Sequence, residues 1–186
     1  MRQVLQHLDS GLTEVAEVPA PGCGEGSPLI RTHSAGGGRI LGEACHFVDL
    51  LRFLVGARIN RVQGRRLEVP GASGREDSAT MTLGFEEGSV GTVHYFANGS
   101  KAYPKETLEV FAGGRILVLS NFRSLVGYGW PSFRSMRSLR QDKGHAACVA
   151  AFLKAVEAGG SAPIPPEEIF EVSSAMFDLV DSMAPA

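Results

Sequence analysis

The chain lacks the features that would assign it to a membrane, a nucleic acid or a metal. None of its apolar runs reaches the roughly 18 residues that a bilayer-spanning helix needs. Lys and Arg number 18 against 20 Asp and Glu, and no basic block is present, which argues against a nucleic-acid or membrane-surface partner. Neither a CxxC nor an HExxH pattern occurs, so the spacing predicts no metal site.

Disulfides and export are not indicated either. The three cysteines, Cys23, Cys45 and Cys148, are odd in number and far apart, which suits reduced thiols better than a disulfide framework. His7 and Asp9 interrupt the N-terminal stretch that would be continuously apolar in a signal peptide. We therefore expect a cytoplasmic protein.

Two glycine-rich segments are candidates for a dinucleotide-binding loop, and we reject both. Residues 22–26 lack the third glycine at the required offset, where Ser27 stands, and they follow a proline-rich linker. Residues 36–42 lie between a possible strand and a helix, but the G-x-G-x-x-G pattern fails at Leu41 and no βαβ unit follows. No dinucleotide is therefore expected to bind this chain alone.

Glycine is abundant, with 23 residues among 186, and many glycines stand where β-hairpins should turn. The Gly113-Gly114 pair between two apolar runs is a strong signal for a two-residue hairpin. The strands of this central region are predicted at residues 58–69, 77–85, 89–97, 107–112, 115–120 and 122–128.

Helices are predicted on both sides of these strands. Apolar residues recur at helical spacing from Ile40 to Val55, and Gly56 is placed to end that helix. Two further helices are predicted at residues 142–158 and 166–183, the second of which starts with Pro-Glu-Glu. The order predicts an α+β fold without a Rossmann domain, in which a mostly antiparallel open sheet is backed on one face by the three helices.

Residues 36–49 read GGGRILGEACHFVD, and this segment resembles the second signature of the glucose–fructose oxidoreductase / inositol dehydrogenase (Gfo/Idh/MocA) family, roughly G-G-G-x-x-x-D-x-G-x-H-x-x-D. The three glycines, His46 and Asp49 fall on the pattern. The resemblance implies that the triple glycine leads into a helix facing the nicotinamide and the sugar. It also implies that this chain is the C-terminal, substrate-facing domain of such an enzyme.

Two positions depart from that signature. The family Asp is Gly42 here, and the family Gly is Ala44. Glu43 is the neighbouring carboxylate, but one residue corresponds to about 100° of helix rotation, so Glu43 needs an adjustment to reach the same spot. The identity of the carboxylate is therefore left open.

The polar residues Glu43, His46 and Asp49 are spaced three apart and form one strip on an otherwise apolar helix. A carboxylate one turn from an imidazole can fix its tautomer and raise its pKa, as an acid/base histidine requires. The resemblance implies that His46 does acid/base or substrate-orienting work, with Glu43 or Asp49 as its orienting partner. A solvated helix face with a satisfied histidine is the alternative.

The resemblance continues at residues 104–106, 110–115 and 141–145, which match a PKE strand start, the following hairpin and a KGH helix start. It suggests Lys105, Lys143 and His145 as substrate-binding residues, the last two at a helix N-terminus. Lys105 is equally explained as an edge lysine that discourages aggregation. Capping of the helix surface is the alternative for Lys143 and His145.

The first 34 residues read differently from the rest, with short strands predicted at 3–5, 13–18 and 28–32. They resemble the opening strands of the GroES-like domain of medium-chain alcohol dehydrogenases. We therefore predict two parts: residues 1–35 as a short β appendage, and residues 36–186 as a Gfo/Idh/MocA-type C-terminal domain for substrate binding and oligomerisation.

The family resemblance implies an oxidoreductase that uses NAD or NADP and acts on a sugar or cyclitol hydroxyl, although this chain lacks the cofactor-binding half. The expected partners are a sugar or cyclitol substrate, a second copy bound through the open sheet face, and a separate Rossmann-containing chain. Two other functions stay open. In the first, the chain is a non-catalytic sugar-binding or assembly module; in the second, it is the remnant of a truncated gene.

Overall fold

A computed structural model describes residues 13–19, 39–67, 78–97, 99–100, 102–103 and 105–183. The strands predicted at 3–5 and 28–32, the glycine-rich segment 22–26 and the triple glycine 36–38 lie outside these residues. No helix in the described ranges is long and apolar enough to cross a membrane.

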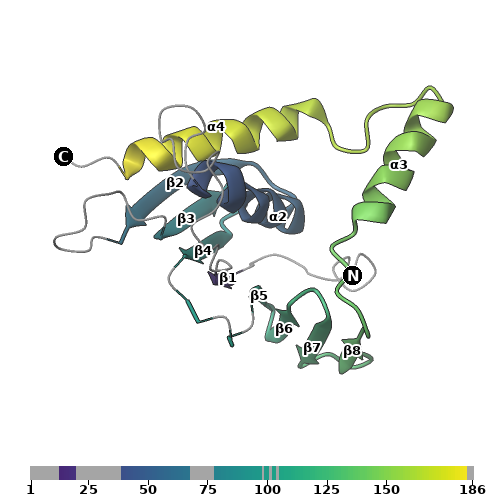
Figure 1. Cartoon of the computed structure of the whole chain (residues 1–186), viewed down its shortest axis with the longest axis horizontal. Coiled ribbons are helices and arrows are strands. Elements are labelled where there is room, and N and C mark those ends of the chain that lie inside the picture. Colours follow the sequence, from purple (N-terminus) through teal and green to yellow (C-terminus); the bar gives the residue numbers. More distant parts are fainter. Residues whose placement is uncertain are drawn as a thin grey trace.

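Eight strands of the described chain form one sheet in the order β2-β3-β4-β1-β5-β6-β7-β8 (Figure 1). All neighbouring strands are antiparallel except β1 and β4, so the predicted mostly antiparallel sheet is confirmed. The strands are β1 (Thr13–Pro19), β2 (Ile59–Arg66), β3 (Ala79–Phe85), β4 (Val90–Phe96), β5 (Thr107–Ala112), β6 (Arg115–Ser120), β7 (Ser124–Tyr128) and β8 (Ser135–Arg137).

The strand β1 joins the two halves of this sheet. It pairs in parallel with β4 and in antiparallel with β5, so that the backbone of Val15 lies between Thr92 and Glu109. The predicted strand at 13–18 is therefore confirmed, but it lies inside the sheet of the second predicted part. Residues 13–19 share one sheet with residues 59–137, although the predicted boundary at residue 35 separates them.

The turn and stop glycines adopt the conformations that their positions require. Gly113 and Gly114 have φ values of 53° and 74°, the left-handed pair of a two-residue hairpin between β5 and β6. Gly56 ends its helix with φ 73°, and its N–H donates to the carbonyl oxygen of Arg52 at 3.0 Å. Both predictions from the sequence are confirmed.

Two helices cover one face of the sheet at β2, β3 and β4 (Figure 1). They are α2 (Cys45–Val55), which follows a π-helical turn η2 (Ile40–Ala44), and α4 (Pro166–Ser182). A Cβ on Gly91 of β4 would lie 2.8 Å from Leu51 Cδ1, which shows how closely α2 approaches the sheet. These two helices confirm the predicted backing layer.

The third helix, α3 (His145–Glu157), was predicted to back the sheet as well, and this prediction is wrong. It stands away from the strands (Figure 1) and has no buried residue. The physical reason is that the corresponding face of β6 and β7 is already covered by the loop after β7. A Cβ on Gly127 would lie 2.7 Å from the ring of Phe133 and 3.0 Å from that of Trp130.

A buried ion pair joins α2, α4 and the start of β2. The Arg52 side chain is 9% exposed, and its Nε donates to Glu171 Oε1 at 3.0 Å. The backbone N–H of Ile59 donates to the same oxygen at 2.7 Å, and Arg58 Nε lies 3.9 Å from Glu171 Oε2. One carboxylate on α4 therefore fixes both the helix that precedes β2 and the first residue of that strand.

We predict that Glu171→Ala destabilises the protein by about 2–3 kcal/mol, because it leaves the Arg52 guanidinium and the Ile59 N–H buried without their main acceptor. Urea unfolding measures this loss. Asp181→Ala, at an exposed position of the same helix, is the control and should change the free energy of unfolding by less than about 0.5 kcal/mol. Equal stability of the two variants would contradict the anchoring role of Glu171.

Candidate functional site

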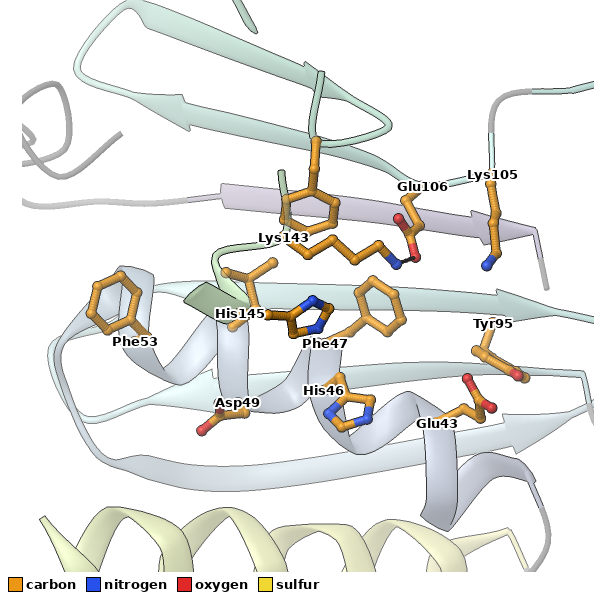
Figure 2. A pocket seen from close by; sticks show the side chains of 12 residues that line it. Glu43, His46, Phe47, Asp49, Phe53, Tyr95, Lys105, Glu106, Lys143 and His145 are labelled. Carbon is orange, nitrogen blue, oxygen red and sulfur yellow. Dashed lines mark hydrogen bonds and ion pairs between the residues drawn. The ribbon is translucent and has the colours of Figure 1, made fainter. Parts of the chain in front are cut away.

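A cavity of about 510 Å³ lies beside α2 (Figure 2). It is bordered by the end of β4, the start of β5, the β6–β7 turn and the segment that leads into α3. All six residues suggested by the sequence line it: Glu43, His46, Asp49, Lys105, Lys143 and His145. The chemical roles assigned to them stay predictions. Their common position means that three segments far apart in the sequence, from Glu43 to His145, contribute to one site.

The wall formed by η2 and α2 presents Glu43, His46 and Asp49 (Figure 2). The sequence predicted one continuous helix over 40–55, but its first five residues form the π-helical turn η2. A π turn has more residues per turn than an α-helix, so it rotates the residues before α2 relative to those in it. Glu43 lies in this turn and lines the cavity.

Electrostatic effects differ between the ionisable groups of α2. Partial burial raises the pKa of the Asp49 carboxyl above its ordinary value of 3.8, while attraction to His46 acts in the opposite direction. Burial is also the main cause that raises the pKa of the Cys45 thiol above 9.0. Cys45 is therefore a protonated thiol at neutral pH and packs against the core.

The opposite wall contains a charged cluster that the sequence did not reveal. Glu106 is buried, with its side chain 8% exposed, and its Oε1 accepts a hydrogen bond from Lys143 Nζ at 2.5 Å (Figure 2). Its Oε2 accepts from Gln141 Nε2 at 3.2 Å. The positive charge of Lys143 is thus balanced within the protein. The substrate-binding role of Lys143 stays a prediction.

Lys105 and His145 complete the lining of the cavity. Lys105 Nζ points toward the space between Glu106 and Tyr95, and the His145 ring lies near Phe47 (Figure 2). The N-terminus of α3 has no side-chain cap, so His145 does not close it. Both side chains are placed to contact a ligand in the cavity.

Sequence reasoning missed the apolar and aromatic lining of the site. Phe47, Leu50 and Phe53 recur at helical spacing beside Glu43 and His46, and this spacing was the available signal. Tyr95 and Phe122 also line the cavity, as does Glu106. The PKE match at residues 104–106 included Glu106 without giving it a role, and no pattern in the sequence singled out Tyr95 or Phe122.

The described residues contain neither a cluster of potential metal ligands nor a βαβ unit. No group of three or more His, Cys, Asp and Glu side chains in these ranges is arranged to hold a metal ion. The described sheet contains one parallel pair of strands, β1 and β4, and no βαβ unit that would bind a dinucleotide.

The sequence model of the GFO/IDH/MocA C-terminal domain matches residues 17–116, just over half of the chain. The chain belongs to this family. The match begins inside β1, at residue 17, so it extends to residues before position 36. The proposed resemblance of the N-terminal segment to a GroES-like domain has no support.

Solved structures share the fold at low sequence identity. UDP-N-acetylglucosamine 3-dehydrogenase GnnA from Acidithiobacillus ferrooxidans is 18% identical, with a TM-score of 0.76 over 98% of this chain and 56% of its own. Levoglucosan dehydrogenase in complex with NADH is 18% identical, with a TM-score of 0.74 over 97% and 58%. GenD2 from gentamicin A biosynthesis, in complex with NAD, is 16% identical, with a TM-score of 0.72 over 97% and 56%.

The chain therefore spans little more than half the length of these structural relatives. A comparison with curated protein sequences finds no match. The likeness establishes the fold of the Gfo/Idh/MocA C-terminal domain.

We predict that Asp49→Asn raises the melting temperature at pH 7. A carboxyl whose folded pKa is raised destabilises the fold above that pKa, and the penalty disappears as pH falls below 3.8, where both states are protonated. The difference between variant and wild type should therefore shrink as pH falls through this window. Thermal unfolding followed by circular dichroism measures it. A lower melting temperature of Asp49→Asn at pH 7 would show that the charged carboxylate stabilises the fold.

Proposed function

We propose that this chain is the substrate-binding and oligomerisation part of an NAD(P)-dependent oxidoreductase that acts on a hydroxyl of a sugar or cyclitol. The observation that carries the proposal is the convergence of the signature helix, the PKE strand start and the KGH segment on one cavity. Family membership supports the reaction class, and the relatives solved with NAD or NADH support the cofactor class.

The residues of the cavity divide into a reacting wall and a binding wall. His46 is the acid/base group that would take or return the proton of the reacting hydroxyl, and Glu43 or Asp49 would orient its ring. Lys105 and His145 would donate hydrogen bonds to other hydroxyls. Phe47 and Phe53 would exclude water from the side of the cavity next to α2.

In this family the nicotinamide ring of the cofactor accepts the hydride. Because the described chain has no unit that would hold a dinucleotide, we propose that a nucleotide-binding domain, on another chain or elsewhere in a longer protein, completes the site. The cavity residues then bind the sugar, orient its carbinol and handle its proton.

A non-catalytic sugar-binding module is the second candidate, and Gly42 is the observation that favours it. The family carboxylate is absent at this position. Nothing lies within 4 Å of where a Cβ on Gly42 would stand, so an aspartate fits there. If Glu43 has taken over the role, Gly42→Asp adds little activity to the completed enzyme; if the site is non-catalytic, no activity appears in the parent protein.

We predict that the chain alone binds a cyclic sugar but neither NAD(H) nor NADP(H). Isothermal titration calorimetry with myo-inositol, D-glucose, levoglucosan and the four nucleotides tests this. Micromolar nucleotide binding would contradict the rejection of residues 36–42 as a cofactor loop. Absence of all sugar binding would remove the support for a substrate cavity.

We predict that His46→Ala lowers kcat by about 10²–10⁴-fold in the enzyme completed by a nucleotide-binding domain, as expected for loss of a general acid/base. His94→Asn is the matched control, because His94 lies on β4 outside the cavity and its Nδ1 is 3.0 Å from Thr80 Oγ1. Steady-state kinetics separates the two variants. Equal kcat for His46→Ala and wild type would exclude His46 as the acid/base group.

We also propose that two copies associate through the sheet face opposite α2 and α4. On this face Val118 and Val126 are paired across β6 and β7 and partly exposed, whereas Leu117 and Leu119 face the other way and are buried. Val118→Arg should convert a dimer to a monomer at micromolar concentration in sedimentation velocity. Leu139→Arg, at a 92% exposed position off this face, is the control. A wild-type monomer would contradict the proposal.

A further inference from the structure

Three residues, Asn121, Phe122 and Arg123, connect β6 to β7, and the β-turn within this connection has an unusual residue at its second central position. Asn121 and Phe122 have φ values of 51° and 48°, and the N–H of Arg123 donates to the carbonyl oxygen of Ser120 at 3.0 Å. A turn with both central residues in the left-handed region favours Asn-Gly, since glycine has no Cβ to clash there. Asn121 suits its position, whereas the large side chain of Phe122 is strained.

The preceding hairpin of the same chain has a turn with the same positive φ angles but without this strain. The β5–β6 turn adopts positive φ at both central positions with Gly113 and Gly114. No described feature of the β6–β7 hairpin prevents a glycine at position 122. A side chain kept in a sparsely populated backbone conformation points to a role for that side chain.

The turn is also the junction of the binding wall. Asn121 Oδ1 accepts hydrogen bonds from the backbone N–H groups of Lys105 at 2.8 Å and Glu106 at 3.1 Å. The carbonyl oxygen of Phe122 accepts one from the N–H of Asp142 at 3.3 Å. The segments that carry Lys105, Lys143 and His145 are thus both attached to this turn.

The Phe122 ring itself lies in the cavity wall. It lines the cavity, is partly buried, and lies 5.8 Å from Lys143 Nζ, whose charge Glu106 holds in place. The strained backbone therefore presents an aromatic surface at a site whose other groups on this wall are polar or charged.

We infer that Phe122 is a specificity-determining residue whose ring packs against the apolar C–H face of a cyclic sugar or cyclitol. The inference rests on the proposed function, and it adds the substrate class: a ring with a C–H face, in preference to an open-chain polyol. Aromatic rings provide such a surface, which an open-chain polyol cannot match without losing conformational freedom.

Phe122→Gly tests the inference through two independent measurements on the whole chain. The melting temperature should stay within about 3 °C of wild type, because relief of the strained φ offsets the lost packing of a partly buried ring. The Kd for the tightest-binding cyclic sugar among myo-inositol, D-glucose and levoglucosan should rise about tenfold, and the preference over D-glucitol should shrink. Phe122→Tyr keeps the ring and should keep both values.

Phe133→Ala is the matched control. This ring packs over Gly127 and does not line the cavity, so its loss should lower the melting temperature and leave Kd unchanged. If Phe122→Gly lowers the melting temperature as much as Phe133→Ala does, Phe122 is a structural residue and the inference is overturned. An unchanged Kd would overturn it as well. If the wild-type chain binds no cyclic sugar, the proposed function fails. If it binds a cyclic sugar with a Kd that Phe122→Gly does not change, only the inference about Phe122 fails.

Discussion

The position of the signature helix depends on the ion pair between Arg52 and Glu171. Glu171 on α4 accepts from the guanidinium on α2 and from the first backbone N–H of β2. An ion pair with so little exposure is a geometric constraint more than a source of net stability, since desolvation offsets most of the attraction. Its effect is to fix the rotation of α2, and thereby the direction in which His46 and Asp49 point.

The binding wall depends on a second buried carboxylate. Glu106 lies at the start of β5, and its two oxygens hold Lys143 and Gln141, which precede α3. Because α3 has no buried residue, these contacts and those of the β6–β7 turn determine where the helix begins. The cavity is thus a space between two anchored segments, and neither anchor belongs to the strip of residues that the sequence singled out.

Local rules predicted much of the fold. Alternation and glycine turns located β5 and β6 with their observed bounds, and Gly56 located the end of α2. The sequence did not reveal that β1 lies between β4 and β5, because strand order is determined by long-range pairing and not by local pattern. It also failed at α3. The apolar residues of that helix indicated burial, but Val149 and Phe152 are 58% and 57% exposed because the loop after β7 covers the strands instead.

The candidate site was predicted by resemblance and by helical spacing, and the residues missed are those that break a local rule. The strand predicted at 122–128 begins only at Ser124, since the turn is built from Asn121 and Phe122 in a conformation that sequence patterns assign to glycine. Glu106 is a buried charge in the segment just before β5, and the helical turn before Cys45 is π-helical.

These three departures, η2, Glu106 and Phe122, occur in three separate segments, and each contributes a side chain to the same cavity. A sequence selected only for stability would favour the local optimum at each of these places: an α-helical turn, an apolar residue at the buried position before β5, and a glycine. Each departure carries a cost in backbone strain or desolvation that the rest of the fold must offset. Their convergence on one cavity is therefore an argument for a function at this site that does not depend on family membership.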